Sequence, residues 1–288
     1  MARLIVTGDD FGLSHAVNQA IIRAHEHGLL TSASLMVNGP AAGEAIALAT
    51  GHPTLAVGLH LVLCQGRSTL APELIPGLVD AGGHFCGNPV RAGLRYFFVK
   101  SLGPQLRREI EAQLSAFHAT GLPLSHLDGH LNLHLHPTVL AILLELAGQY
   151  RIPAMRLPLD DLRATLALDA RRLTYKLTHA VIFGALCRYA RPRLAAAGVR
   201  AADRVYGLLQ SGDMNEAFLL GLLPRMRGEL VEWYCHVGLP ACPELEALTS
   251  DRVLEAVAAR GLMLTSYRDL PGGSASPSSI NRPPSTIR

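Results

Sequence analysis

The strongest constraint on the fold is the alternation of short apolar segments with segments of helical periodicity. One apolar segment, LAVGLHLVL, is hydrophobic at almost every position, as expected of a strand covered on both faces. Eight segments read as strands, and they occupy residues 3–8, 32–38, 55–63, 125–134, 154–158, 204–209, 231–236 and 262–267. Strands that alternate with helices form parallel sheets, so we expect an α/β fold of the distorted TIM-like (β/α) barrel type. A doubly wound open sheet is the alternative.

Local signals mark several of the intervening helices. The first helix is expected between Ser14, a residue type that caps helix N-termini, and Gly28, which is typical of a helix C-terminal stop. Further helices are expected over residues 40–50, 103–120 and 137–150. This order of elements favours a parallel sheet.

Composition limits the class of protein. The 288 residues are 49% hydrophobic, enough for one large core and therefore for a single domain. The formal net charge is only +3, and no basic run is interleaved with aromatic residues, so no nucleic-acid partner is expected. Five scattered cysteines without a CxxC pair are typical of a reduced cytosolic protein. Without a secretory segment or a run of about 18 apolar residues, the chain is expected in the cytoplasm.

Changes in composition predict the domain organisation. We expect one barrel domain over residues 1–270, with a helical insertion at about 160–203, followed by a disordered tail over 271–288. Residues 151–205 hold eleven Lys and Arg against four Asp and Glu, and the insertion is apolar as well as basic. We interpret it either as a solvated helix packed on the barrel or as an interfacial helix or lid that meets anionic lipid or an amphipathic substrate. The second interpretation places the protein at the periphery of the inner membrane.

Polar residues of catalytic type follow several predicted strands. Asp9 and Asp10 end the first strand, His60 lies near the end of the third, and His236 ends the seventh. The cluster HLDGHLNLHLH, residues 126–136, ends the fourth strand. Active sites of barrels of this type form at the carboxyl ends of the strands. These side chains are therefore expected to converge on one mouth of the barrel.

The residue types in this set point to a metal ion. Two histidines and one carboxylate are a common ligand set for Zn²⁺, and a divalent ion also offsets the repulsion between Asp9 and Asp10. One aspartate would bind the ion and the other would remain free as a base. Spacing alone does not decide which histidines bind, because His126 and His130 share a face in either a strand or a helix. A turn or a helix cap is the alternative interpretation of the aspartate pair.

Five motifs together resemble a known family. TGDDFGLS, TSASLMVN, VGLHLVL, HLDGHLNLHLHP and WYCH follow one another over about residues 3–270, and this set resembles the YdjC-like carbohydrate deacetylases, which include chitooligosaccharide deacetylases. Within that family the chain is most similar to the hopanoid-biosynthesis-associated branch. The resemblance implies a distorted TIM-like barrel and metal-dependent removal of the N-acetyl group from a glucosamine unit. For the hopanoid branch it implies an N-acetylglucosaminyl hopanoid, a glycolipid, as the substrate.

The resemblance also implies roles for individual residues. It implies that Asp10, His60 and His130 bind the metal, that Asp9 is the catalytic base and that His236 is the general acid. Chitooligosaccharide deacetylases have a denser histidine run where this chain has Leu131 and Asn132, and a Phe where it has His136. These differences spare the three implied ligands and concern the contacts to the sugar.

Two further residues are expected to support the site. Arg156, at the end of the fifth predicted strand, would hold Asp9 ionised through a charge-assisted hydrogen bond, or would serve as a buried structural arginine. Asp128 would orient a ligand histidine. His126, His134 and His136 are left without a role.

The expected cofactor is one divalent metal ion, with Zn²⁺ best suited and Mg²⁺, Ni²⁺ or Co²⁺ also compatible. The expected partners are a glycolipid or amino-sugar substrate, a membrane surface and a second copy of the chain. Three rival functions are a deacetylase of soluble chitooligosaccharides, a metal-dependent phosphoesterase and a non-catalytic sugar- or lipid-binding protein.

Overall fold

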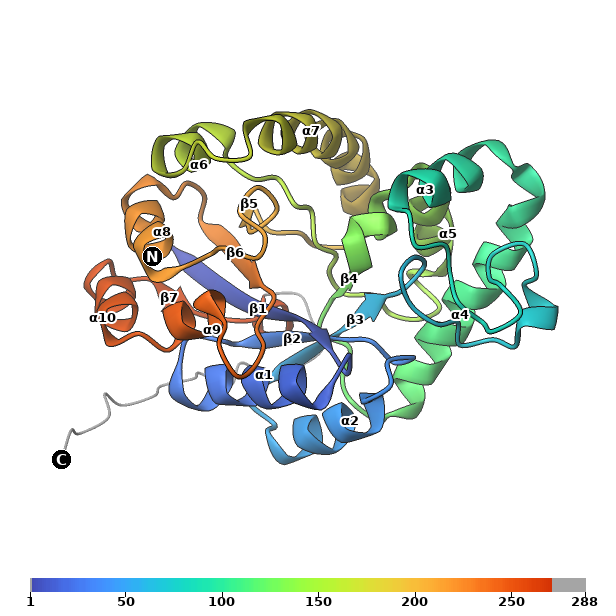
Figure 1. The fold of residues 1–288 in the computed structure, drawn as a ribbon, viewed down its shortest axis with the longest axis horizontal. Coiled ribbons are helices and arrows are strands. Elements are labelled where there is room, and N and C mark those ends of the chain that lie inside the picture. The colour runs from blue at the N-terminus through green and yellow to red at the C-terminus, as the bar shows by residue number, and fades with distance from the viewer. Residues whose placement is uncertain (1, 271–288) are drawn as a thin grey trace.

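A parallel β-sheet forms the centre of the computed structural model, which describes residues 2–270 (Figure 1). The strands are β1 (Arg3–Phe11), β2 (Ser32–Leu35), β3 (Ala56–Leu61), β4 (Leu127–Gly129), β5 (Arg204–Tyr206), β6 (Leu230–Cys235) and β7 (Met263–Leu264). Their order is β4-β3-β2-β1-β6-β5, with β7 paired to the first residues of β1, and every pair is parallel. The predicted distorted TIM-like α/β barrel is confirmed.

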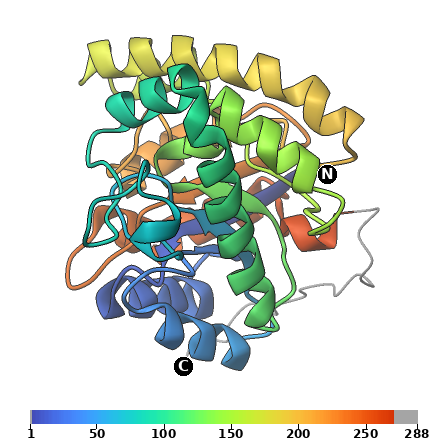
Figure 2. The same ribbon diagram turned by 90° about the vertical axis from the view of Figure 1, so that its right-hand side faces the viewer.

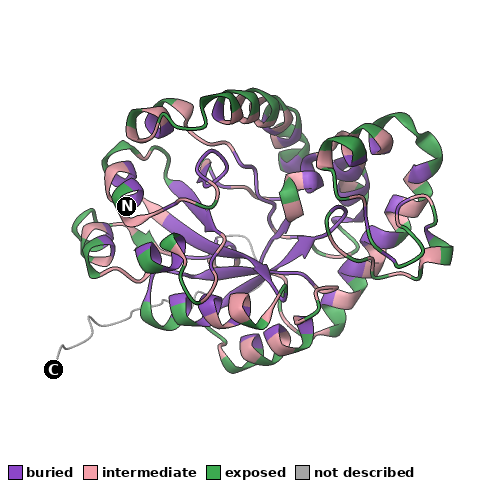
Figure 3. Cartoon of the chain, viewed as in Figure 1, coloured by how far each residue is buried: buried purple, intermediate pink, exposed green. Residues whose placement is uncertain are grey.

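Helices surround this sheet and cover its outer face (Figures 1 and 3). They are α1 (His15–His27), α2 (Ala42–Gly51), α3 (Pro89–Phe98), α4 (Gly103–Ala119), α5 (Pro137–Leu146), α6 (Leu162–Leu168), α7 (Leu173–Ala196), α8 (Glu216–Leu222), α9 (Pro243–Leu248) and α10 (Asp251–Ala259). The strands are almost entirely buried, whereas the outward faces of the helices are exposed (Figure 3). Polar side chains of the sheet can therefore meet solvent only at the ends of the strands.

The fifth predicted strand, residues 154–158, is not a regular strand. This segment makes only two isolated parallel bridges, Leu127↔Met155 and Ala154↔Arg200. Pro153 precedes it and Pro158 is its last residue, and proline has no amide hydrogen for a strand ladder. The segment nevertheless spans the gap between β4 and β5, which makes the barrel distorted.

Several strands end earlier in the sequence than predicted. The second predicted strand ends at Leu35 and the sixth at Tyr206. The fourth is regular only over Leu127–Gly129, after which the chain enters a 3₁₀ segment, His130–Leu135. Within that segment Leu131 and Asn132 both have φ of 55°, a left-handed conformation that is costly for residues other than glycine. The strand therefore ends in a tight turn that changes the direction of the following side chains.

The first helix begins and ends where predicted, but its end has a different cause. The Ser14 hydroxyl accepts a hydrogen bond from the Val17 amide at 3.2 Å, so Ser14 is the N-terminal cap. Gly28 has an extended backbone with φ of −139°, not the left-handed turn of a typical C-terminal glycine. A Cβ atom at this position would lie 2.3 Å from the carbonyl oxygen of Leu248. Glycine is required here by the close approach of the end of α9.

The residues predicted to form a helical insertion, about 160–203, contain α6 and α7, which lie between the bridging segment and β5 in the chain. Helix α7 runs across one end of the molecule, which also carries α3 (Figures 1 and 2). Among the described residues, no helix is long and apolar enough to cross a bilayer. The predicted disordered tail, 271–288, lies outside the described residues.

Replacing Gly28 with alanine tests the packing of α1 on α9. The added methyl group would collide with backbone oxygens of Leu248 and Ala24. We expect Gly28→Ala to lower the free energy of unfolding by about 1–3 kcal/mol, measured by chemical denaturation. In the matched control Gly184→Ala, at a glycine of α7, the added Cβ atom meets no heavy atom beyond the backbone of its own helix within 4 Å. Stability should therefore be unchanged or raised by up to about 1 kcal/mol. Equal stability of the two variants would contradict the packing argument.

Candidate active site

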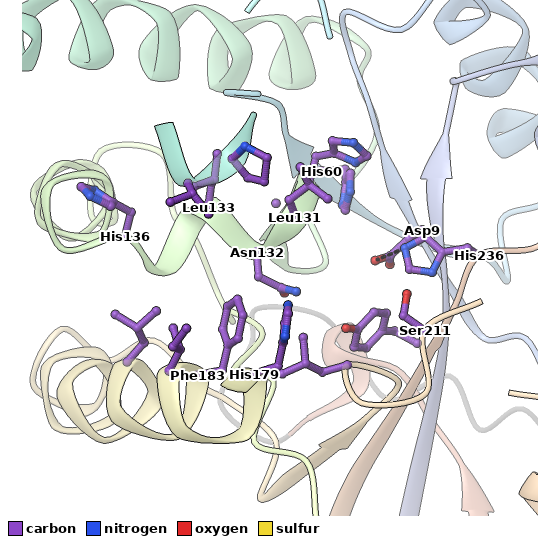
Figure 4. A pocket seen from close by; sticks show the side chains of 18 of the residues that line it. Asp9, His60, Leu131, Asn132, Leu133, His136, His179, Phe183, Ser211 and His236 are labelled. Atoms are coloured by element: carbon purple, nitrogen blue, oxygen red, sulfur yellow. Dashed lines mark ion pairs between the residues drawn. The ribbon is translucent and has the colours of Figure 1, made fainter. Parts of the chain in front are cut away.

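The carboxyl ends of β1, β3, β4 and β6 open into one cavity of about 510 Å³. The cavity is lined by all five residues predicted to carry the chemistry: Asp9, Asp10, His60, His130 and His236 (Figure 4). They come from four separate strand ends, which the parallel sheet brings to the same mouth.

Asp10, His60 and His130 form the tightest cluster in this cavity. A carboxylate oxygen of Asp10 lies 2.9 Å from Nδ1 of His130 and 3.3 Å from Nε2 of His60. One ligand atom from each residue lies within 4.8 Å of the other two. The His60 Nε2 atom is buried without a hydrogen bond, despite its closeness to Asp10. A buried nitrogen in this state, beside a carboxylate and a second imidazole, fits a divalent cation.

Electrostatics in the cluster also favour a cation. Burial alone would raise the pKa of Asp10, but the hydrogen bond with His130 and the close contact with His60 outweigh it and hold the pKa well below its usual range. Burial would lower the pKa of His60, yet the neighbouring carboxylates of Asp128 and Asp10 raise it to about 10. The surrounding negative charge thus stabilises positive charge at His60.

A second group with ligand-like spacing is Asp9, His60 and Asp128. The carboxylates of Asp9 and Asp128 are already engaged by the guanidinium of Arg156, which is a competing positive charge. The group of Asp10, His60 and His130 contains no such competitor, so it fits a metal ion better.

Arg156 lies at the centre of a buried carboxylate cluster. It is fully buried and donates two hydrogen bonds to Asp9, at 2.7 and 2.8 Å. The same guanidinium lies 2.8 Å from Asp128 and 2.9 Å from Glu232. Burial would lower the pKa of Arg156, but the three carboxylates raise it well above its usual value. The paired geometry fixes the orientation of the Asp9 carboxylate.

Asp128 connects this cluster to the candidate ligands. Its carboxylate lies 2.7 Å from Nδ1 of His60 and accepts a 2.7 Å hydrogen bond from the Ser34 hydroxyl. Burial would raise the pKa of Asp128, but Arg156 and His60 lower it. A carboxylate bound to one imidazole nitrogen orients the ring and leaves the other nitrogen free for a metal ion.

The remaining histidines of the 126–136 cluster lie in different surroundings. His126 is buried against Ser34, at 3.1 Å, and burial lowers its pKa. Nε2 of His134 lies 2.9 Å from the backbone oxygen of Arg156, and burial lowers the pKa of His134 to about 4. Both are neutral residues of the interior at neutral pH. His136 lines the far part of the cavity, away from the cluster (Figure 4).

His236 lies beside Asp9 in the cavity. Its Nε2 atom is 4.0 Å from a carboxylate oxygen of Asp9, and its side chain is 35% exposed. Its backbone amide donates a 2.5 Å hydrogen bond to the buried Glu244, which anchors the loop after β6. The imidazole is thus held at the cavity while remaining open to solvent.

One buried carboxylate beside the site, that of Glu232, was not predicted from the sequence. Glu232 lies within β6 and accepts hydrogen bonds from Thr7 and Tyr267, at 2.8 and 2.7 Å. The available signal was a carboxylate inside the otherwise apolar run LVEWYC, where every residue is buried. Asn132 lines the cavity, and its Oδ1 atom is buried without a hydrogen bond.

The part of the cavity farthest from the aspartates is apolar. Helix α7 contributes Tyr175, His179 and three aliphatic or aromatic side chains, and the ring centroids of Tyr175 and His179 lie 3.8 Å apart with the rings tilted by 31°. Figure 4 shows His179 and Phe183 on α7 facing Leu131 and Leu133 across the cavity. The three other α7 side chains are Ile182, Phe183 and Leu186, and Val90 and Leu208 complete the apolar wall. A ligand would meet polar groups at one end of the cavity and hydrocarbon at the other.

The arrangement defines a class: a parallel barrel with a candidate site for one cation, and an aspartate and a histidine beside it. The chain matches the model of the YdjC-like protein family over residues 3–259, and it belongs to that family.

Two curated relatives are similar to the chain. A carbohydrate deacetylase of Brevibacillus brevis is 44% identical over 151 residues, which is 52% of this chain and 58% of that protein. A chitooligosaccharide deacetylase of Serratia marcescens is 31% identical over 93% of this chain and 98% of that protein. The family resemblance therefore extends over nearly the full chain.

A crystal structure from Enterococcus faecalis has the same fold. That protein, provisionally described as a cellobiose-phosphate cleavage protein, aligns with a TM-score of 0.71 and 28% sequence identity. The alignment covers 93% of this chain and 98% of the other.

Removing the charge of Arg156 tests the buried cluster. In Arg156→Met three buried carboxylates would lose their counter-ion, so we expect the free energy of unfolding to fall by about 3–5 kcal/mol. The control is Arg107→Met, which removes an exposed pair with Glu111 and Glu145 and should cost at most about 1 kcal/mol. Both are measured by urea denaturation, and similar losses in the two variants would contradict the role given to Arg156.

Proposed function

We propose that this chain is a metal-dependent carbohydrate N-deacetylase, and that its substrate is an N-acetylglucosaminyl hopanoid. The observation that carries the proposal is the meeting of Asp10, His60 and His130 with Asp9 and His236 in one cavity of a YdjC-like protein. The reaction is hydrolysis of the acetamide bond, which releases acetate and leaves a free amine on the sugar.

The proposed metal ligands are Asp10, His60 and His130. Their two nitrogen donors and one oxygen donor suit Zn²⁺ best. When bound there, the ion supplies Lewis-acid polarisation of the acetyl carbonyl and lowers the pKa of water. Asp128 holds the His60 ring in position through its 2.7 Å contact to Nδ1.

Asp9 is the proposed general base, and it takes a proton from water at its carboxylate. The two hydrogen bonds from Arg156 fix this carboxylate and stabilise its charge. His236 is the proposed general acid: its solvent-accessible imidazole donates a proton to the leaving amine nitrogen. Because an amine is a poor leaving group unless it is protonated, this step completes the cleavage.

The apolar wall of the cavity supports a sugar carried on a lipid. Ile182, Phe183 and Leu186 of α7 extend the cavity away from the polar end. A polycyclic hydrocarbon could bind there while the acetamide group lies beside Asp9. We place this activity in the cytoplasm, at the periphery of the inner membrane.

A soluble chitooligosaccharide is the second candidate substrate. It is favoured by the Serratia relative, whose name gives that substrate and which aligns over 93% of this chain. The metal ligands and the proposed proton-transfer residues would be the same for both substrates. The two candidates differ only in what occupies the apolar part of the cavity.

Acetate release by Asp9→Asn tests the chemistry. We expect zinc-loaded wild-type protein to release acetate from N-acetylglucosaminyl hopanoid, and Asp9→Asn to lower kcat by roughly 10²–10⁴-fold because the proton acceptor is lost. The variant should still bind one equivalent of zinc, measured by calorimetry. A kcat within a few-fold of the wild type would exclude Asp9 as the base.

The metal ligands are tested in parallel with Asp10→Asn. This variant should lose zinc binding, together with the thermal stabilisation that zinc gives the wild type, about 2.7 kcal/mol at a hundredfold excess over Kd.

Diacetylchitobiose serves as the second substrate of the wild-type protein and tests which sugar is deacetylated. Acetate from diacetylchitobiose alone would keep the deacetylase mechanism and reject the hopanoid, whereas turnover of neither substrate would reject the proposed function.

A further inference from the structure

The exposed hydrophobic side chains of this protein are concentrated on two helices. Fourteen large hydrophobic residues are exposed within residues 2–270. Five of them lie on α3 or on Val99, which follows it, and five lie on α7. Scattered exposed hydrophobic residues are normal, but a concentration of this kind indicates an interaction surface.

On each helix these residues form a stripe. Val90, Leu94 and Phe98 follow one another at intervals of four residues on α3, and Val90 and Phe98 each expose 69% of their surface. Leu177 and Val181 have the same spacing on α7, where Val181 is 72% exposed. Neither stripe is covered by another part of the described chain.

The two stripes border the mouth of the active-site cavity. Val90 of α3 and Ile182 of α7 belong to the cavity lining and are themselves exposed, at 69% and 53%. The apolar wall inside the cavity is therefore continuous with the apolar surface outside it. Figures 1 and 2 place both helices at the same end of the molecule.

Charge on the two helices has one sign. Neither helix contains an aspartate or a glutamate. On and next to α3 the basic residues are Arg91, Arg95 and Lys100, and on α7 the basic residues that are not buried are Arg188, Arg191 and Arg193. Lys176 of α7 is buried and pairs with Asp169. Apolar stripes flanked by basic residues alone complement a surface that is negatively charged outside and hydrocarbon inside, which is the surface of an anionic bilayer.

We propose that a docking rim, formed by Val90, Leu94 and Phe98 of α3 and by Leu177, Val181 and Ile182 of α7, binds the surface of an anionic membrane. The rim lies in the interface without spanning the bilayer, and it opens the cavity toward the lipid phase. A lipid-linked substrate would enter the cavity laterally, with its hydrocarbon part never crossing water. This use of the rim rests on the proposed function, whereas membrane binding itself does not.

The test is binding to lipid vesicles. Full-length protein is mixed with vesicles of phosphatidylcholine containing phosphatidylglycerol, or of phosphatidylcholine alone, and binding is measured by co-sedimentation. We expect binding to the anionic vesicles, weakened by salt, and at least tenfold weaker binding in the double variant Leu94→Glu/Val181→Glu. The matched control, Leu74→Glu/Met263→Glu, places the same charges at two other exposed positions, each 51% exposed, and should bind like the wild type.

Activity on diacetylchitobiose separates the two proposals. Leu94 and Val181 do not line the cavity, so the rim variant should keep wild-type turnover of this soluble substrate, which also shows that it is folded. Loss of vesicle binding with normal turnover supports the docking rim. The docking rim would be overturned if the wild-type protein did not bind vesicles, or if the rim and control variants bound them equally. Either result would count whether or not the protein turns over diacetylchitobiose. The proposal would also be overturned if the wild type did not bind vesicles and formed a dimer that the rim variant lost. The rim would then be a surface for self-association.

Discussion

The structure depends on the charge balance around Arg156. Three carboxylates from three parts of the barrel, Asp9 on β1, Asp128 on β4 and Glu232 on β6, are buried against one guanidinium. Carboxylates without this partner would have to be neutral or exposed. Because Arg156 lies in the segment that bridges β4 and β5, the same ion pairs hold the closing segment to the rest of the sheet. The ion pairs of Arg156 thus fix the position of Asp9 and also hold in place the segment that completes the barrel.

The general form of the site could be predicted because it follows from local sequence and from the geometry of parallel sheets. Strand ends are visible where apolar runs stop, and in a parallel barrel the carboxyl ends of strands share a mouth. Asp9, Asp10, His60 and His236 each sit at such an end, and the structure brings them to one cavity. The assignment of His130, by contrast, depended on the family resemblance, since spacing did not separate it from His126.

Other features could not be predicted because they arise from contacts between distant segments. Glu232 looks like an outward-facing residue until β6 is known to be buried on both faces. The residues around Met155 have the composition of a strand, but the prolines beside them leave only isolated bridges. Leu131 and Asn132 both have a left-handed backbone although neither is a glycine, the residue type that usually signals this conformation in a sequence.

The polar end and the apolar wall of the cavity come from different parts of the fold. The polar residues belong to the ends of strands, whereas Tyr175, His179 and Phe183 belong to α7, inside the insertion between the bridging segment and β5. An insertion joined to the barrel at its two ends can change in length and side chains while the strand ends keep their places. A change of side chains on α7 would therefore alter the apolar wall of the cavity and leave Asp9, Asp10 and His60 where the strands hold them.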